Sequence, residues 1–219
     1  MPIIPEKERA HVKSLLEKEM KHDVIVVNFS QEFECDYCRE TRQLLNELAQ
    51  ISNKIKVESY DFVKDAEKAK EFGVDKIPAT IIMGEKDYGI RYFGIPSGYE
   101  FSSFLEDIVD VSKRNTRLSQ ASKDKLKTVN KPIHIQVFVT PTCPYCPRAV
   151  RLAHQFAMEN DLIRADMIES TEFPQLSNKY DVMAVPKIVI NESIAFEGAL
   201  PEAHFLGQVM LALEKHGHT

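Results

Sequence analysis

Apolar and polar residues form two kinds of pattern along the chain, one typical of strands and one of helices, and together they predict a mixed α/β fold. Short β-branched and aromatic runs predict buried strands, beginning with residues 24–29 and 133–139. After each of these runs, apolar residues recur three and four positions apart, as on one face of an amphipathic helix. Further strands are expected at 55–60, 80–83, 90–93, 162–168, 187–190 and 193–196. Further helices are expected at 6–20, 65–72, 98–111, 120–129, 172–180 and 201–214.

The two halves of the chain repeat the same pattern. A shift of 108 residues carries Cys35 onto Cys143 and Pro78 onto Pro186, and each cysteine pair ends 40 residues before its proline. The expected order in each half is strand, helix, strand, helix, strand, strand, helix. A strand–helix–strand start implies a parallel crossover, and two strands joined by a short turn are antiparallel. We therefore expect mixed central sheets flanked by helices.

The repeat sets the expected domain boundaries. With 219 residues, the chain is long enough for two units of about 100 residues, each with its own core. We assign residues 1–115 to the first unit and 116–219 to the second, with a polar linker near 113–119. Gly94 and Gly198 are only 104 positions apart, so we expect the second unit to lack four residues in a hairpin turn.

Composition narrows the classes of function. The formal net charge of −5 argues against a general nucleic-acid binder. No run approaches the roughly 18 apolar residues of a membrane helix, and we expect no membrane association. The N-terminus is charged almost at once and has no apolar stretch of a signal peptide, so we expect a cytoplasmic protein.

All four cysteines fall into two Cys-x-x-Cys pairs, each between a predicted strand and a predicted helix. A cysteine attacks as the thiolate, which the unpaired N–H groups and the positive end of a helix stabilise at its N-terminus. The second cysteine, three residues on, resolves the mixed disulfide formed by the first. We assign Cys35 and Cys143 as attacking thiols, and Cys38 and Cys146 as resolving thiols.

A proline precedes an apolar strand in each half, in Ile77-Pro78 and Val185-Pro186. A proline there cannot donate to the sheet ladder. A cis bond before it would turn the chain sharply and expose the backbone of the preceding residue. We therefore predict cis prolines, and an extended substrate chain that binds along these two dipeptides.

The strand, the Cys-x-x-Cys pair, the helix and the Ile/Val-Pro dipeptide resemble the thioredoxin/glutaredoxin superfamily, and Cys143-Pro-Tyr-Cys146 is similar to the glutaredoxin motif. Two such units in one chain resemble the protein disulfide oxidoreductases of hyperthermophiles. The resemblance implies tandem thioredoxin-like units whose sheets join into one, and electron exchange with protein disulfides. It also implies a thioredoxin-reductase-like flavoenzyme as reductant, no cofactor beyond the two redox-active disulfides, and a thermophilic source.

Two departures from these relatives bear on mechanism. Thioredoxins carry a buried acid six residues before the first cysteine, whereas this chain has Phe29 and Val137 at those positions. A proton acceptor must therefore come from elsewhere. Glutaredoxins follow their last strand with two glycines and an acid that hold glutathione, and the run 196–200 lacks them. This argues against glutathione as the reductant.

The two centres differ in charge. Glu32, Glu34 and Asp36 surround Cys35, and Arg39 offsets them only in part, whereas no acid lies near Cys143 in the sequence. Like charge disfavours a thiolate, so we predict that Cys143 has the lower thiol pKa and that the second centre is the more oxidising. The alternative is that solvent screens the exposed acids and the two centres are nearly equal.

Other interpretations of these residues remain open. A zinc ribbon needs pairs about 15–20 residues apart, so the separation of the two pairs disfavours zinc. Tyr37 and Tyr145, inside the motifs, are candidates for shaping substrate access or are simply exposed aromatics. Asp61 and Glu169 end matching strands, where acids commonly act as caps.

Three functions fit the sequence. The first is exchange with protein disulfides, including reduction, oxidation and isomerisation. The second is a dedicated electron donor to a peroxiredoxin-type partner. The third is a non-catalytic holdase whose cysteines are structural.

Overall fold

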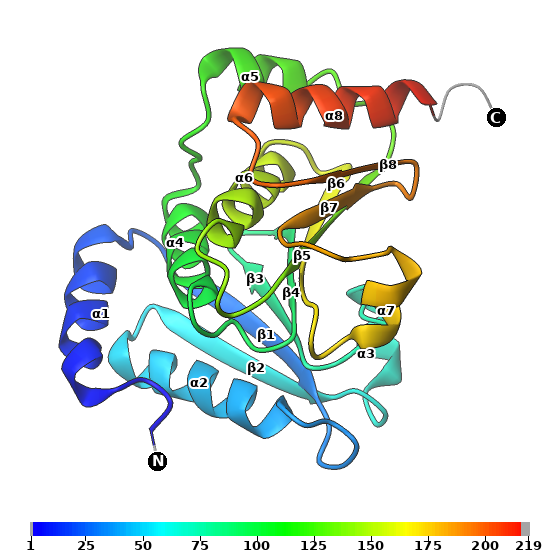
Figure 1. Ribbon diagram of the computed structural model, residues 1–219. Helices are drawn as coiled ribbons and strands as arrows, with labels where there is room; N and C mark the ends of the chain where they lie inside the picture. The colour runs from blue at the N-terminus through cyan, green and yellow to red at the C-terminus, as the bar shows by residue number, and fades with distance from the viewer. Residues whose placement is uncertain (1, 216–219) are drawn as a thin grey trace.

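The computed structural model describes residues 2–215, over which eight helices and eight strands follow one another (Figure 1). The strands are β1 (Val24–Ser30), β2 (Ile55–Asp61), β3 (Ala79–Met83), β4 (Asp87–Phe93), β5 (Ile133–Val139), β6 (Ile163–Glu169), β7 (Lys187–Ile190) and β8 (Ile194–Glu197). The helices are α1 (Glu6–Glu19), α2 (Cys38–Ile51), α3 (Ala66–Glu71), α4 (Glu100–Lys113), α5 (Gln120–Leu126), α6 (Cys146–Glu159), α7 (Pro174–Lys179) and α8 (Glu202–Lys215). Every helix and strand expected from the sequence is present, within a few residues of its expected bounds.

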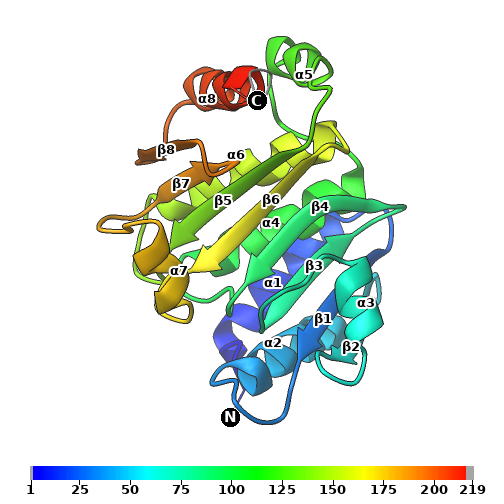
Figure 2. The same ribbon diagram turned by 90° about the vertical axis from the view of Figure 1, so that its right-hand side faces the viewer.

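All eight strands belong to one sheet, in the order β2-β1-β3-β4-β6-β5-β7-β8 (Figure 2). Within each half, one strand pair is parallel and two are antiparallel. Strands β4 and β6 pair in parallel across the halves, with Ile90 opposite Ala165 and Phe93 opposite Ile168. The expected mixed sheets and their fusion into one continuous sheet are confirmed.

The sheet separates two apolar layers, because successive side chains of a strand point to opposite faces. Helices α1, α2, α4 and α6 cover one face, and the short helices α3 and α7 cover the other (Figures 1 and 2). Val26 of β1 packs in the first layer and its neighbour Val27 in the second. Both layers run across both halves of the chain, so the joint between the halves has a continuous core.

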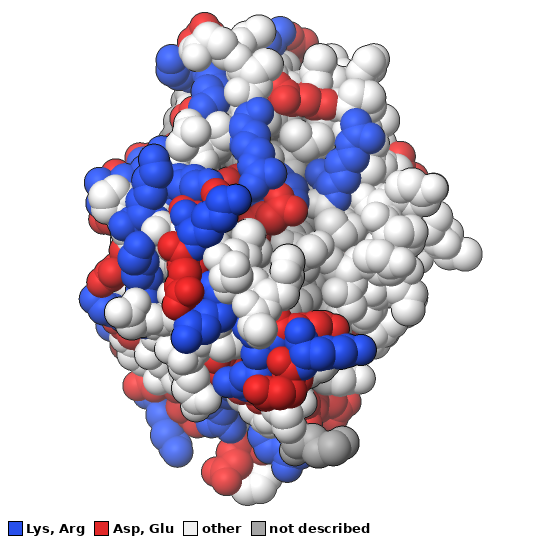
Figure 3. All heavy atoms as spheres, turned by 90° about the vertical axis from the view of Figure 1, so that its left-hand side faces the viewer, with Lys and Arg blue, Asp and Glu red and all other residues white. Residues whose placement is uncertain are grey.

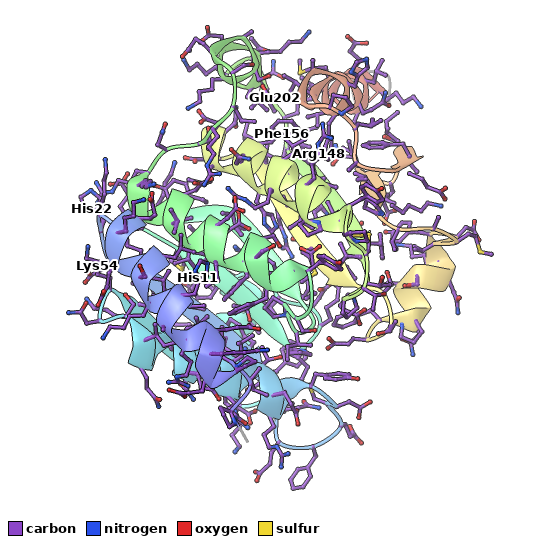
Figure 4. All side chains as sticks on the ribbon, turned by 60° about the vertical axis from the view of Figure 1, so that its left-hand side comes forward. His11, His22, Lys54, Arg148, Phe156 and Glu202 are labelled. Atoms are coloured by element: carbon purple, nitrogen blue, oxygen red, sulfur yellow. A yellow bond between two sulfur atoms is a disulfide. The ribbon has the colours of Figure 1, made fainter. Side chains whose placement is uncertain are left out.

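Helix α8 closes the second half by packing against α5 and α6. Phe205 of α8 meets Phe156 of α6, with ring centroids 5.3 Å apart. At the start of α8, Glu202 accepts hydrogen bonds from the backbone N–H and the hydroxyl of Ser119, which caps α5 (Figure 4). The segment expected to be a polar linker is therefore tied to the second half.

The shorter second hairpin differs from its expected form. The turns between β3 and β4 and between β7 and β8 each contain three residues, 84–86 and 191–193. The missing four residues come from the strands, since β8 has four residues where β4 has seven. The prediction of a shortened turn was wrong because β4 lies inside the sheet, whereas β8 lies at its edge and needs no second partner strand.

A buried cluster of charged and polar side chains joins the two halves behind the sheet. Asp107 of α4 binds the guanidinium of Arg151 and the hydroxyl of Tyr92, and lies 2.6 Å from Nδ1 of His154. Asp110 binds the same guanidinium. Burial pushes the pKa of Asp107 upward, but Arg151 and His154 outweigh it and hold that pKa below its usual value. The carboxylate is therefore ionised and paired at the joint.

The surface that carries helix α1 shows acidic and basic side chains intermixed, without a large patch of one sign (Figure 3). Within residues 2–215, no helix is long and apolar enough to cross a membrane. The same residues contain no group of three or more His, Cys, Asp or Glu side chains placed to hold a metal ion.

Glu100, the first residue of α4, gives stability a dependence on pH. Burial raises the pKa of Glu100 to about 7, although the Ser103 hydroxyl binds the carboxylate. The folded state then binds this proton more tightly than the unfolded chain, so stability falls as the pH rises from 4.5 to about 7. We expect Glu100→Gln to raise the free energy of unfolding at pH 8 by about 3 kcal/mol. Urea denaturation at pH 4 and pH 8 measures this, and an equal gain at both pH values would contradict it.

Candidate redox site

The first cysteine pair forms a disulfide between the end of β1 and the start of α2. The Cα atoms of Cys35 and Cys38 are 5.5 Å apart. Cys38 is 1% exposed, whereas Cys35 is half-buried. The outer sulfur is therefore the one that a partner thiol or disulfide reaches first, which supports the predicted order of attack.

The second pair forms the matching disulfide between β5 and α6. The Cα atoms of Cys143 and Cys146 are also 5.5 Å apart. Cys143 is 7% exposed and Cys146 is completely buried. The Cys146 N–H donates to Cys143 Sγ at 3.2 Å, and the same sulfur lies 3.7 Å from the carbonyl oxygen of Val185. Arg148 lies exposed on the first turn of α6 beside this pair (Figure 4).

The helices begin later than the sequence suggested. Both α2 and α6 start at the resolving cysteine, so the attacking cysteines lie in the preceding turn. Pro144 is thus outside the helix, and Pro147, at the second helical position, breaks no intrahelical bond because its nitrogen would have no partner there. At the second centre, the first N–H of the helix, that of Cys146, still donates to Cys143 Sγ and can stabilise a thiolate there, as expected.

Each disulfide faces its own proline loop. The Ile77–Pro78 and Val185–Pro186 bonds are both cis, as predicted. The carbonyl oxygen of Pro78 accepts the Gly94 N–H at 2.9 Å, and that of Pro186 accepts the Gly198 N–H at 2.8 Å. The two loops are therefore held in the same way, and the substrate-binding role of these four residues stays a prediction.

The tyrosines of the two motifs are exposed side chains. Tyr37 is 44% exposed and Tyr145 is 71% exposed. Two further apolar side chains near the centres are largely exposed, Phe33 beside Cys35 and Met183 just before Val185. An apolar surface of this kind suits contact with another protein rather than with a small polar molecule.

The hollow beside the first centre has a wall built by the other half of the chain. The hollow, of about 440 Å³, is bounded on one side by Cys35 and Pro78. Its opposite side comes from Thr171 and Glu172 in the loop between β6 and α7, and from Gln175 in the first turn of α7. This wall exists because β4 has β6 as its neighbour, whereas the matching strand β8 lies at the edge of the sheet.

Glu172 is the residue in this wall that the sequence did not single out. Its Oε1 accepts the Ile95 N–H at 2.7 Å, and within residues 2–215 its buried Oε2 has no hydrogen-bond partner. Burial raises the pKa of Glu172 to about 7, and the carboxylates of Glu169 and Asp36 add to the rise. The repeat offered a signal, because the same 108-residue shift places Lys64 at this position in the first half.

The acids that end β2 and β6 act as caps, as expected. Asp61 Oδ1 accepts the N–H groups of Val63 and Lys64. Glu169 Oε2 accepts the Glu172 N–H at 2.8 Å and the Thr171 hydroxyl at 2.6 Å. Glu169 thereby fixes the start of the loop that presents Glu172 to the first centre.

A sheet of this topology, carrying two disulfide-bonded Cys-x-x-Cys pairs that each face a cis proline, defines a thiol–disulfide oxidoreductase of the thioredoxin fold. Family models agree: one described as Thioredoxin matches residues 5–107, and one described as Thioredoxin domain matches residues 133–211. A protein disulfide oxidoreductase from Aeropyrum pernix superposes with a TM-score of 0.91 and 34% identity, over 97% of this chain and 94% of that one. The chain belongs to the protein disulfide oxidoreductase family with tandem thioredoxin domains, as the sequence indicated.

Other relatives share only a part of their length with this chain. An alkyl hydroperoxide reductase component from Staphylococcus epidermidis is 31% identical over 71% of the chain, which corresponds to 28% of that protein. A protein named NADH dehydrogenase from Bacillus subtilis is 28% identical over 72% of the chain and 29% of its own length. The chain thus spans just over a quarter of these curated relatives. A structure of the alkylhydroperoxide reductase protein AhpF from Enterococcus faecalis shares the fold, with a TM-score of 0.86, 24% identity and coverage of 94% of this chain and 98% of that one.

We predict that Cys143 has a lower thiol pKa than Cys35 in the reduced protein. The Cys146 N–H points at the Cys143 sulfur, whereas Cys35 faces Asp36, Glu34 and Glu172 around the hollow. Alkylation rates measured against pH in the Cys35→Ser and Cys143→Ser variants give the two values. A lower pKa at Cys35 would show that the greater burial of Cys143 outweighs its hydrogen bond.

Proposed function

We propose that the chain exchanges electrons with protein disulfides through both cysteine pairs, by way of a mixed disulfide. The observation that carries this proposal is the graded burial within each pair. The outer cysteine, half-buried at Cys35 and 7% exposed at Cys143, is bonded to an inner cysteine that is at most 1% exposed. A structural disulfide would have no need of an outer sulfur facing a proline loop. The graded arrangement instead suits successive attack by two thiols.

In the reducing direction, the thiolate of Cys35 or Cys143 attacks one sulfur of a substrate disulfide. A bond forms between the two sulfurs, the substrate S–S bond breaks, and the second substrate sulfur leaves as a thiolate that takes up a proton. Cys38 or Cys146 then loses its proton and attacks the outer cysteine, which releases the first substrate sulfur. The substrate gains two electrons, and the centre is left as its disulfide.

The surroundings of each centre favour an extended segment of a protein as substrate. The backbone of Ile77 and of Val185 lies at the edge of its proline loop, beside the outer cysteine. Exposed apolar side chains near the centres, Phe33, Tyr37, Tyr145 and Met183, offer contact to apolar residues of an unfolded or loosely folded chain. Tyr37 and Tyr145 would then shape access to the sulfurs.

The electron source and the location of the protein belong to the same proposal. A thioredoxin-reductase-like flavoenzyme would reduce the two disulfides in the cytoplasm, and no cofactor beyond these disulfides would take part. The second centre, with its stabilised Cys143 thiolate, would be the more oxidising of the two. Redox titration of variants that keep only one cysteine pair measures both potentials.

A second candidate function is electron donation to a dedicated peroxiredoxin-type partner. It is favoured by the relatives whose names identify them as components of alkyl hydroperoxide reductase. On that proposal the chain would act as a carrier for one partner rather than on many protein disulfides.

Assays with the two kinds of partner separate these functions. The reduced protein is mixed with insulin, with scrambled ribonuclease and with a peroxiredoxin, and the Cys35→Ser/Cys143→Ser variant serves as the inactive control. Rapid reduction of insulin and refolding of ribonuclease support the first function. Rapid turnover with peroxiredoxin alone supports the second, and equal rates for the wild type and the double variant would refute both.

A further inference from the structure

The hollow beside Cys35 contains an acid that the exchange steps do not yet use. Glu172 reaches the hollow from the second half of the chain, opposite Cys35 and Pro78. A substrate segment that lies along Ile77 and Pro78 would pass between the sulfur and this carboxyl group. Glu172 is therefore placed to touch the reacting part of a substrate bound at the first centre.

The two oxygens of Glu172 differ in their partners. The Ile95 N–H holds Oε1 at 2.7 Å and so fixes the side chain, while the buried Oε2 lacks a hydrogen-bond partner among residues 2–215. A buried oxygen without a partner is costly unless a ligand, a water or a proton satisfies it. The hollow is polar and large enough to hold a water or a substrate group at this oxygen.

The charged groups around Glu172 come from two segments. Glu169 ends β6, and Asp36 and Glu34 come from the turn that contains Cys35, while the segment after β4 contributes the uncharged Ile95 N–H. All three charged neighbours are acids. The pKa of about 7 follows from burial first and from Glu169 and Asp36 second, so the carboxyl group exchanges its proton near neutral pH.

We propose that Glu172, supplied by the second half of the chain, is the general acid–base that serves disulfide exchange at the first centre. This inference rests on the proposed function. It also supplies the proton-exchanging group that Phe29, at the position of the usual buried acid, cannot provide.

During exchange at the first centre, Glu172 donates one proton and later takes one up. The Cys35 thiolate attacks one substrate sulfur, the substrate S–S bond breaks, and the departing sulfur takes the proton of Glu172 to leave as a thiol. Glu172 becomes a carboxylate and takes up the proton of Cys38 when Cys38 attacks Cys35. The bond between Cys35 and the substrate then breaks, and the remaining substrate sulfur leaves as a thiolate. In the oxidising direction, the same carboxylate accepts the proton of an incoming substrate thiol.

The neighbouring acids are not equivalent to Glu172. Glu34 and Asp36 are exposed to solvent. Glu169 accepts two hydrogen bonds as a cap through Oε2, and it is not among the residues that line the hollow. Within residues 2–215, no strand pairs with the outer edge of β8, so no loop corresponding to that of Glu172 lies beside Pro186. The role of Glu172 therefore belongs to the first centre alone.

The test uses proteins that retain one cysteine pair. The Cys143→Ser/Cys146→Ser protein isolates the first centre, and the Cys35→Ser/Cys38→Ser protein isolates the second. Each is reduced beforehand and mixed with a fluorogenic peptide disulfide in single-turnover experiments from pH 5 to pH 9. Glu172→Gln is introduced into both, and the exposed Glu67→Gln on α3 serves as the matched control.

We expect the first centre to show a rate that rises as Cys35 ionises and falls as Glu172 loses its proton near pH 7. In the Glu172→Gln variant, the falling limb should disappear and the rate at pH 6 should drop about tenfold. The second centre and the Glu67→Gln proteins should change less than twofold. Two carboxyl NMR signals, those of Glu100 and Glu172, should titrate near pH 7, and one of the two should be absent only from the Glu172→Gln proteins.

Other results would overturn the inference. Faster exchange in the Glu172→Gln variant above pH 7, where the Glu172 carboxylate is ionised, would mean that Glu172 acts only by repelling the Cys35 thiolate. An unchanged profile, or an equal loss at both centres, would also refute the acid–base role. If the unmodified first centre reduces no peptide disulfide, the proposed function itself fails there, which is distinct from an active centre that ignores the substitution.

Discussion

Replacing Asp107 with alanine is expected to lower the free energy of unfolding by about 3–5 kcal/mol. Asp107 is completely buried and accepts from Arg151 and Tyr92, with His154 Nδ1 at 2.6 Å. The substitution leaves the buried Arg151 guanidinium with Asp110 as its one buried carboxylate partner, and removes the acceptor of the Tyr92 hydroxyl. Loss of one member from such a cluster costs more than a single hydrogen bond, because the remaining charge stays buried. Urea denaturation at pH 7 measures the effect.

An exposed ion pair across the same joint provides the matched control. Lys86 and Asp161 also link the two halves of the chain, but both side chains lie largely in solvent. We expect Asp161→Ala to change stability by no more than about 1 kcal/mol. Similar losses for Asp107→Ala and Asp161→Ala would show that the buried cluster adds no particular stability to the joint.

The second large effect is expected for Gly94→Ala, which should lower the free energy of unfolding by about 2–4 kcal/mol. Gly94 has a φ of +94°, which disfavours any residue with a Cβ. A Cβ there would lie 2.6 Å from Cβ of Glu169 and 2.8 Å from Oε1 of Glu172. Since Glu172 lines the hollow of the first centre, the substitution should also slow exchange at that centre. Thermal denaturation and single-turnover rates check the two effects.

Gly198 is a control that separates the free-energy cost of a positive φ from the cost of the steric clash at Gly94. It occupies the matching position of the second half and has a φ of +87°, but a Cβ there would meet no atom within 4 Å among the described residues. We expect Gly198→Ala to cost about 1–2 kcal/mol, from the backbone alone. Equal losses at the two glycines would argue against close contact between the halves at Gly94.

Much of the fold could be predicted because the hydrophobic pattern of each segment agreed with the internal repeat of the whole chain. The β-branched runs at 24–29 and 133–139 became β1 and β5, and the 108-residue repeat placed equivalent strands and helices in both halves. The cis state of Pro78 and Pro186 followed from their position before an apolar strand. The pairing of each Cys-x-x-Cys as a disulfide followed from its spacing at a strand–helix junction.

The rest depended on contacts between residues far apart in the sequence. Arg151 and Asp107 are 44 positions apart, and neither lies in a sequence motif that predicts a buried ion pair. Glu172 lies 77 positions from its partner Ile95 and in a different half from Cys35. No periodicity along the chain reports such partners, because they follow from how β4 and β6 pair.

The pairing of β4 with β6 joins the halves head to tail, and a head-to-tail contact does not close on itself. Repeating the same operation would add strand β2 of another molecule to β8, and so on into a filament. The two free edges oppose this growth. β8 offers only four residues, and β2 carries the charged side chains of Lys56 and Glu58 among its exposed positions. The shortened second hairpin, which leaves β8 only four residues long, thus disfavours strand-by-strand polymerisation.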